Sequence, residues 1–135
     1  MPATPDAIAV AVTACRAADD KQATDLLVLD VADLLALVDL FVIATARSDR
    51  QLRAVGEAVE ERLRAGHSLR PLRREGPAES GWLLLDYGDV VCHLFDQERR
   101  EYYALERLWA DVPQLDPLRG EPLPAARPRE AEHAG

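Results

Sequence analysis

The sequence predicts an α/β or α+β domain in which a mixed sheet of about five strands is flanked by helices. Three observations lead to this class. Short apolar runs bounded by turn residues indicate strands, longer segments with apolar side chains at helical spacing indicate helices, and the two kinds of segment alternate along the chain. The 135 residues are enough for one domain built around one hydrophobic core.

The first half of the chain predicts a helix and two strands. Residues 5–20 place apolar side chains at helical spacing, which is typical of a short amphipathic helix. Strands are expected at 26–31 and 38–45, where the runs 26–31 and 41–44 are almost continuously apolar. Such runs indicate strands that are covered on both faces of the sheet.

A second helix is expected to begin at Ser48. Ser48 and Gln51 have the spacing of a capping box, in which each side chain bonds a free backbone N–H of the first turn. Gly66 stands where a helix stop is expected. The segment 69–73 is a weaker candidate for a short edge strand.

The second half of the chain predicts a β-hairpin and a last helix. Two apolar runs within residues 81–95 flank an Asp-Tyr-Gly-Asp turn, where Gly88 supplies the positive φ that a tight turn needs. Asp96 is suited to cap a last helix, one face of which carries Tyr102, Leu105 and Trp109. Proline recurs from residue 113 onward, so we expect a domain at 1–112 and a disordered Pro-rich tail at 113–135.

The hairpin also holds the candidate binding residues. A two-residue loop between Asp86 and Asp89 would place Trp82 opposite His93 on one sheet face. Two interpretations follow. Trp82 and Tyr87 form an exposed aromatic patch rimmed by carboxylates, or they are an ordinary core aromatic and an ordinary turn residue. The residues alone favour the second interpretation.

The sequence holds no complete catalytic set. Asp86 and Asp89 are a possible pair for Mg²⁺ or acid–base chemistry, but aspartate is also a common turn residue. His93 on a strand indicates a core or interface histidine, while Cys15 and Cys92 indicate buried thiols. Because nucleophile and phosphate-loop motifs are missing as well, we expect no enzyme, no cofactor and no metal.

The charge points to a protein partner. The formal net charge is −8 at pH 7. An acidic chain is poorly suited to attract RNA or anionic lipid, so a basic protein partner is favoured over nucleic acid. No apolar run is long enough for a membrane span and no signal peptide is visible, which predicts a cytoplasmic protein.

An ordered set of short motifs resembles the ribosomal silencing factor family, also called the Iojap-like family. The likeness covers residues 5–111 and is most specific from Trp82, through the Asp-Tyr-Gly-Asp turn, to the Tyr-Tyr and Leu-x-x-Leu-Trp motifs. The matching segments lie at 29–31, 38–45, 48–51, 75–76, 81–82, 86–91, 93–95, 100–103 and 105–109.

The resemblance implies a nucleotidyltransferase-like fold that needs no catalysis for its role. It implies binding to the large ribosomal subunit through its fourteenth ribosomal protein, a blocked junction with the small subunit, repressed translation, and a homodimer when alone. It places the partner-binding surface around Trp82 and Tyr87. We expect Asp86 and Asp89 to pair with basic groups of the partner there, and His93 to belong to the same partner-binding surface. Two alternatives remain: a small nucleotidyl- or phosphoryl-transferase, and a dimeric adaptor with another protein target.

Overall fold

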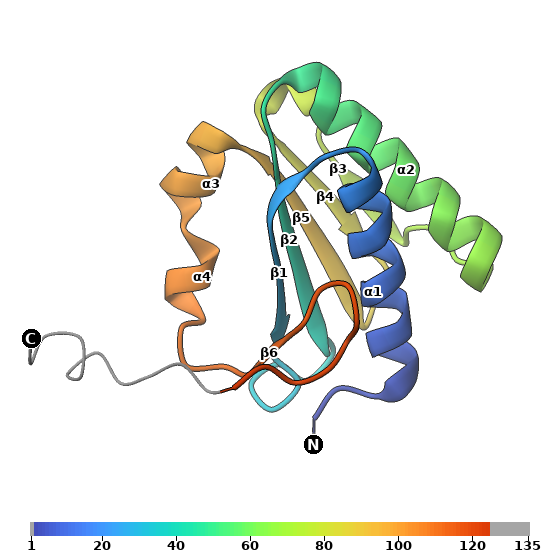
Figure 1. Ribbon diagram of the computed structural model, residues 1–135, viewed down its shortest axis with the longest axis vertical. Coiled ribbons are helices and arrows are strands. Elements are labelled where there is room, and N and C mark those ends of the chain that lie inside the picture. The colour runs from blue at the N-terminus through green and yellow to red at the C-terminus, as the bar shows by residue number, and fades with distance from the viewer. Residues whose placement is uncertain (1, 125–135) are drawn as a thin grey trace, which may run out of the picture.

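The computed structural model describes residues 2–124 and contains one six-stranded mixed sheet flanked by helices (Figure 1). The helices are α1 (Pro5–Asp20), α2 (Asp49–His67), the 3-10 turn η1 (Ala78–Ser80), α3 (Gln97–Tyr103) and α4 (Leu105–Leu108). The strands are β1 (Thr24–Asp30), β2 (Leu40–Ala46), β3 (Arg73–Glu75), β4 (Trp82–Asp86), β5 (Val90–Asp96) and β6 (Gln114–Leu115). The predicted mixed α+β class is confirmed, with one strand more than expected.

The sheet runs in the order β3-β4-β5-β2-β1-β6. Its central pair, β2 and β5, is parallel, and every other pair in it is antiparallel. Helices α1 and α2 cover one face, while α3 and α4 stand on the other side (Figure 1). The two faces therefore bury two separate groups of apolar side chains.

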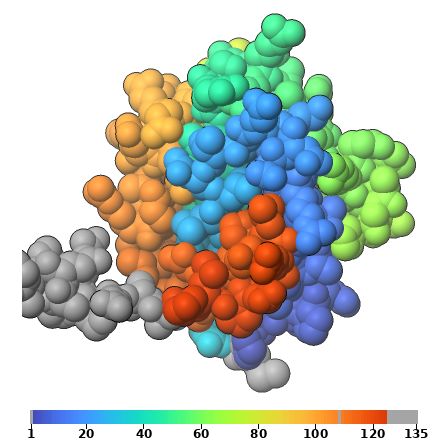
Figure 2. All heavy atoms as spheres, in the orientation of Figure 1, coloured from blue at the N-terminus to red at the C-terminus, as the bar shows by residue number. Residues whose placement is uncertain are grey.

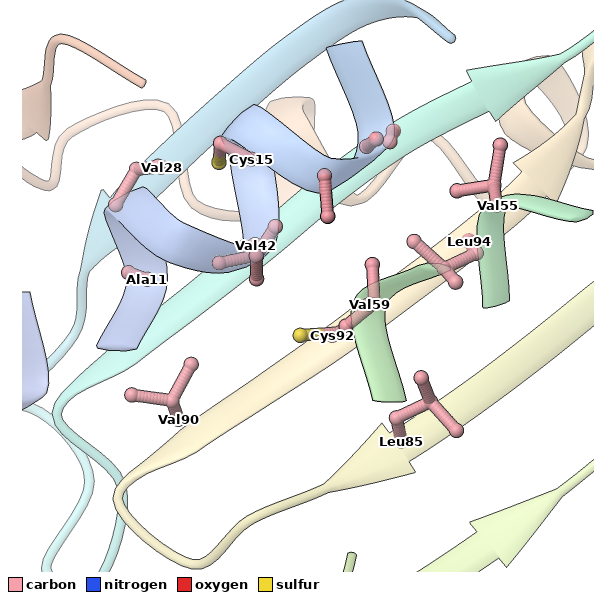
Figure 3. Close-up of a cluster of buried hydrophobic side chains, with 14 of the residues drawn as sticks. Ala11, Cys15, Val28, Val42, Val55, Val59, Leu85, Val90, Cys92 and Leu94 are labelled. Atoms are coloured by element: carbon pink, nitrogen blue, oxygen red, sulfur yellow. The ribbon is translucent and has the colours of Figure 1, made fainter. Parts of the chain in front are cut away.

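The larger core lies between the sheet and the helix pair α1 and α2 (Figure 3). Cys15 of α1 and Cys92 of β5 are free and fully buried there, as the sequence predicted. Burial raises the pKa of Cys92 to about 12, and that of Cys15 is raised further for the same reason. Both thiols therefore stay protonated at neutral pH and serve as small apolar side chains.

Helix α2 begins as predicted but ends two residues later. Ser48 Oγ accepts a hydrogen bond from Gln51 N at 3.1 Å. The Gln51 side chain does not complete the capping box, because its Oε1 accepts from Arg47 N at 2.6 Å instead. The predicted stop at Gly66 is wrong, since Ser68 takes the left-handed conformation (φ 57°) that ends the helix.

The turn of the β4–β5 hairpin is one residue later than predicted. Tyr87 N donates to Val90 O at 2.9 Å, which makes Gly88 and Asp89 the two loop residues. Gly88 has φ 93° and so supplies the positive φ, as expected. The predicted opposition of Asp86 and Asp89 is therefore wrong.

The later turn changes the cross-strand partners but not the faces. Trp82 lies opposite Phe95, and His93 lies opposite Leu84. The sequence predicted Trp82 opposite His93, so the register differs by two residues. Because side chains alternate with a period of two, Trp82 and His93 still share one face.

The last predicted helix is broken into α3 and α4. Asp96 Oδ1 accepts from Arg99 N at 2.7 Å, which confirms the predicted cap. Ala104 then takes φ 45° and ends α3 after seven residues. Tyr102 is 79% exposed, so the predicted shared face of Tyr102, Leu105 and Trp109 is wrong.

Residues 113–124 join the fold, contrary to the prediction of a disordered tail. Strand β6 pairs with β1 and buries Leu115. Arg16 of α1 donates from Nε and Nη2 to the carbonyl of Leu118, at 2.9 and 2.6 Å. Figures 1 and 2 show this segment lying over β1 and against α1. The tail predicted at 125–135 lies outside the described residues.

Replacing Gly81 with alanine is expected to destabilise the fold by about 2 kcal/mol. Gly81 has φ 84°, and a Cβ atom there would lie 2.5 Å from Asp96 Oδ2 and 2.7 Å from Arg99 Cγ. Gly66→Ala is the matched control, because nothing lies within 4 Å of a Cβ added in that helix. Chemical denaturation should show a loss for the first variant and none for the second. Equal stability of Gly81→Ala and the parent would contradict the assigned turn.

Candidate protein-docking face

The sheet face opposite α1 and α2 gathers most of the aromatic side chains of the described residues. We call this surface the aromatic face. Its members come from β2, β4, β5, the end of α3 and the residue after α4. They are Phe41, Trp82, His93, Phe95, Tyr103 and Trp109.

The rings on the aromatic face touch in a continuous series. Trp82 lies 4.6 Å from Tyr103 and 5.4 Å from Phe95, between ring centroids. Phe41 meets His93 edge-on at 5.0 Å. Such contacts are typical of stabilising aromatic pairs, so neighbouring rings on this face support one another.

His93 is held uncharged on this face. It is 8% exposed, and within residues 2–124 neither ring nitrogen has a hydrogen-bond partner. Burial lowers the pKa of His93 to about 4, and the negative charge of Asp86 offsets part of that effect. At neutral pH the imidazole is therefore neutral, with one nitrogen as a donor and the other as an acceptor.

Trp82 borders an open groove. We call this hollow of about 470 Å³ the Trp82 groove. Its lining combines the end of β3, the loop around η1, β4 and α3, and consists of Arg74, Glu75, Gly76, Pro77, Ser80, Trp82, Leu84 and Tyr103. The indole ring is half-buried, but its Nε1 is fully buried and has no partner in the described part of the chain.

Tyr87 does not lie on the aromatic face. It is 6% exposed and packs with the larger core on the side of α1 and α2. Burial raises the pKa of its hydroxyl. The predicted exposed patch formed jointly by Trp82 and Tyr87 is therefore wrong, because the pleat of the hairpin sends the two rings to opposite faces.

The two aspartates of the hairpin have separate structural contacts. Asp86 Oδ1 accepts from Gly88 N at 2.8 Å. Asp89 is exposed, and its backbone carbonyl accepts from Asp39 N at 2.8 Å and from Leu40 N at 3.0 Å. Residues 2–124 contain no group of three His, Cys, Asp or Glu side chains that could hold a metal ion. The contact from Asp86 to the backbone two residues later is the one expected of a turn aspartate.

Sequence reasoning missed Arg100, which fixes α3 beside the aromatic face. Its side chain is buried, and Nη1 donates to Asp25 O at 2.8 Å and to Thr45 Oγ1 at 2.7 Å. Its Nε donates to Glu106 Oε1 at 3.3 Å. A single arginine thus joins α3 to β1, β2 and α4, and no pattern in the sequence marked it as buried.

The fold and this face define a small α+β domain with an aromatic sheet surface, and the chain belongs to the ribosomal silencing factor family. The family described as "Ribosomal silencing factor during starvation" matches residues 4–134. The chain is 38% identical over 103 residues to ribosomal silencing factor RsfS of Bacillus subtilis, which covers 76% of this chain and 86% of that protein.

A second relative and a solved structure support membership of the same family. The chain is 32% identical over 111 residues to the chloroplastic protein Iojap of Arabidopsis thaliana, covering 82% of this chain and 46% of that protein. A crystal structure from Chromobacterium violaceum aligns with a TM-score of 0.71 at 31% identity, covering 76% of this chain and 84% of that one. The names of the relatives describe a regulatory factor of the ribosome rather than an enzyme.

Within residues 2–124, none of the helices combines the length and apolar character needed to cross a membrane.

Proposed function

We propose that this protein silences the ribosome by binding the large subunit through its fourteenth ribosomal protein. The bound domain would occupy space that the small subunit needs, so the subunits would not join and translation would be repressed. The observation that carries the proposal is the 38% identity to a ribosomal silencing factor over 76% of the chain. The aromatic face supplies a physical means of docking.

Trp82 is the proposed anchor of docking. It is large, it packs against the buried Phe95, and it borders the Trp82 groove. Interfaces draw most of their binding free energy from a few such aromatic residues. His93 supports the anchor from the neighbouring strand, with its ring centroid 5.9 Å from that of Trp82.

Charge complementarity supports the same partner. The chain carries a formal net charge of −8, and ribosomal proteins are mostly basic. Asp86 is half-buried on the face of β4 that carries Trp82, and Asp89 is exposed at the hairpin turn. Opposite charges steer association and fix the orientation of a complex, which is the role we propose for these two carboxylates.

The Trp82→Ala variant is expected to lose at least about thirtyfold in affinity for the large subunit. The reason is the loss of the anchor ring from the face. Sedimentation of purified large subunits with each variant through a sucrose gradient provides the measurement. Tyr87→Ala is a poor choice for this test, because it would remove a core side chain.

Leu118→Ala is the matched control. Leu118 lies in the segment that packs against α1, away from the aromatic face, and it is partly exposed. This variant should travel with the large subunit as the parent does. If Trp82→Ala does so as well, Trp82 is not the anchor. If the parent itself stays at the top of the gradient and joined subunits are unchanged, the proposed function fails.

A further inference from the structure

Three of the four buried side-chain polar atoms without a hydrogen-bond partner in residues 2–124 lie on the aromatic face. They are Trp82 Nε1, His93 Nδ1 and His93 Nε2. Buried polar atoms are nearly always paired, and each exception needs a physical reason. The concentration of exceptions on one face, beside an open groove, indicates a surface that is completed by another molecule.

Tyr103 covers this surface. Its ring lies 4.6 Å from Trp82 and 5.8 Å from Phe95, between centroids. The Tyr103 side chain is itself 41% exposed and lines the Trp82 groove. A ring that is packed on one side and open to solvent on the other can leave its place without opening the core.

The backbone at Tyr103 is suited to such a movement. Tyr103 is the last residue of α3, and Ala104 follows it with φ 45°, a conformation that non-glycine residues seldom adopt. Helix α4 has only four residues. Arg100 holds α3 to β1 and β2, so the last residue of the helix, Tyr103, could unwind while the rest of α3 stays in place.

We propose that Tyr103 is a gate over Trp82, and that the partner opens it and places a backbone carbonyl on Trp82 Nε1. This inference rests on the proposed function and specifies how the same face is used. An indole N–H is only a donor, so the partner must bring an acceptor. A carboxylate is disfavoured by the net charge of −8.

The occupant is an irregular loop of a basic protein. Loops carry carbonyl groups that no neighbouring strand or helix has paired. The Trp82 groove of about 470 Å³ can receive an apolar side chain of that loop beside Leu84 and Pro77. Opening the gate costs free energy, so the parent binds more weakly than a chain whose gate is already open.

The test compares affinities for purified large subunits. Tyr103→Ala removes the covering ring, so we expect binding about threefold to tenfold tighter than that of the parent. Tyr103→Phe keeps the ring and should bind like the parent. Trp82→Phe keeps an aromatic ring but removes the N–H, and should bind about fivefold or more weakly.

A second measurement, made without the ribosome, tests whether the Tyr103 ring covers Trp82. The chain has two tryptophans, so Trp109→Phe leaves Trp82 as the sole indole. Adding Tyr103→Ala to this background should increase quenching of Trp82 fluorescence by acrylamide. Circular dichroism on each variant checks that it is folded.

The outcomes separate the gate from the proposed function. If the parent binds and Tyr103→Ala binds equally or more weakly, the ring is not a gate, and the silencing role stands. If quenching is unchanged in the Tyr103→Ala variant, the ring does not cover Trp82 and the gate is refuted directly. If the parent does not bind large subunits at all, the proposed function fails and the docking role of the gate fails with it.

Discussion

Replacing Arg100 with alanine is expected to destabilise the protein by about 3 kcal/mol, the largest stability loss that we expect from a single polar side chain here. Arg100 is 7% exposed. Its loss would leave the buried Thr45 hydroxyl without its charged donor and free the Asp25 carbonyl. It would also leave Glu106 without the ion pair that joins α4 to α3.

Urea denaturation monitored by circular dichroism measures this loss. The matched control is Arg64→Ala, because Arg64 pairs with Glu61 on the surface of α2, where both side chains are more than half exposed. Surface pairs contribute little, so the control should leave the free energy of unfolding nearly unchanged. Similar losses in the two variants would show that Arg100 does not join the elements as described.

The burial of Arg100 could not be predicted from the sequence. Arginine is almost never fully buried unless it is paired, so a polar helix face is the ordinary expectation for the charged run at 97–101. The burial depends on two acceptors distant in sequence, the Asp25 carbonyl and Thr45 Oγ1. The Asp25 carbonyl can reach Arg100 because the backbone of Asp25 takes φ 50° at a point in β1 where the register with β2 shifts. No pattern of neighbouring residues in the sequence predicts this irregularity in β1.

For the β4–β5 hairpin, the sequence predicted correctly which strand residues share a sheet face, but it predicted the wrong cross-strand partners. Gly88 is compatible with either two-residue loop, Tyr87-Gly88 or Gly88-Asp89, because both place a glycine at a turn position. The choice between them moved every cross-strand partner by two residues. It could not move a side chain to the other face, so Trp82 and His93 stay together.

The alternation of side chains along a strand also explains why Trp82 and Tyr87 do not form the predicted exposed patch. Trp82 and Tyr87 are separated by five positions, and an odd separation along a strand places side chains on opposite faces. The sequence therefore contained the signal that Tyr87 would leave the aromatic face if the strand continued to the turn. The wrong turn position hid that signal, because it treated Tyr87 as a loop residue.

Two other wrong predictions, the unbroken last helix and the disordered tail, concern residues whose type does not indicate the conformation they adopt. Ala104 has high helix propensity, yet it takes the left-handed conformation that separates α3 from α4. Leu115 lies among prolines that suggested disorder, yet one short strand pair with β1 and one buried side chain are enough to order that segment. In both cases tertiary contacts override the local preference.

Acid is expected to weaken the fold through His93. The pKa of His93 is lowered to about 4 in the folded protein from an ordinary value of 6.5, first because burial disfavours the imidazolium ion. Above pH 6.5 the ring is neutral in both folded and unfolded states, and the full stability is present. As the pH falls from 6.5 toward 4, the unfolded chain gains a proton that the folded protein does not. The free energy of unfolding should fall by about 3 kcal/mol across that window.

His93→Phe tests this linkage. Phenylalanine keeps an aromatic ring against Phe41 and Trp82 and cannot titrate, so the variant should lose the His93 share of the acid dependence between pH 6.5 and 4. The carboxyl groups are the same in both proteins, so the difference between the two curves isolates the histidine. His67→Gln is the control: His67 lies on α2 with its Nε2 2.8 Å from Thr13 Oγ1, away from the aromatic face, and its loss should leave the His93 effect in place. Parallel curves for the parent and His93→Phe would mean that His93 takes up its proton in the folded state as readily as in the unfolded one, and that the aromatic face is wetter than its packing indicates.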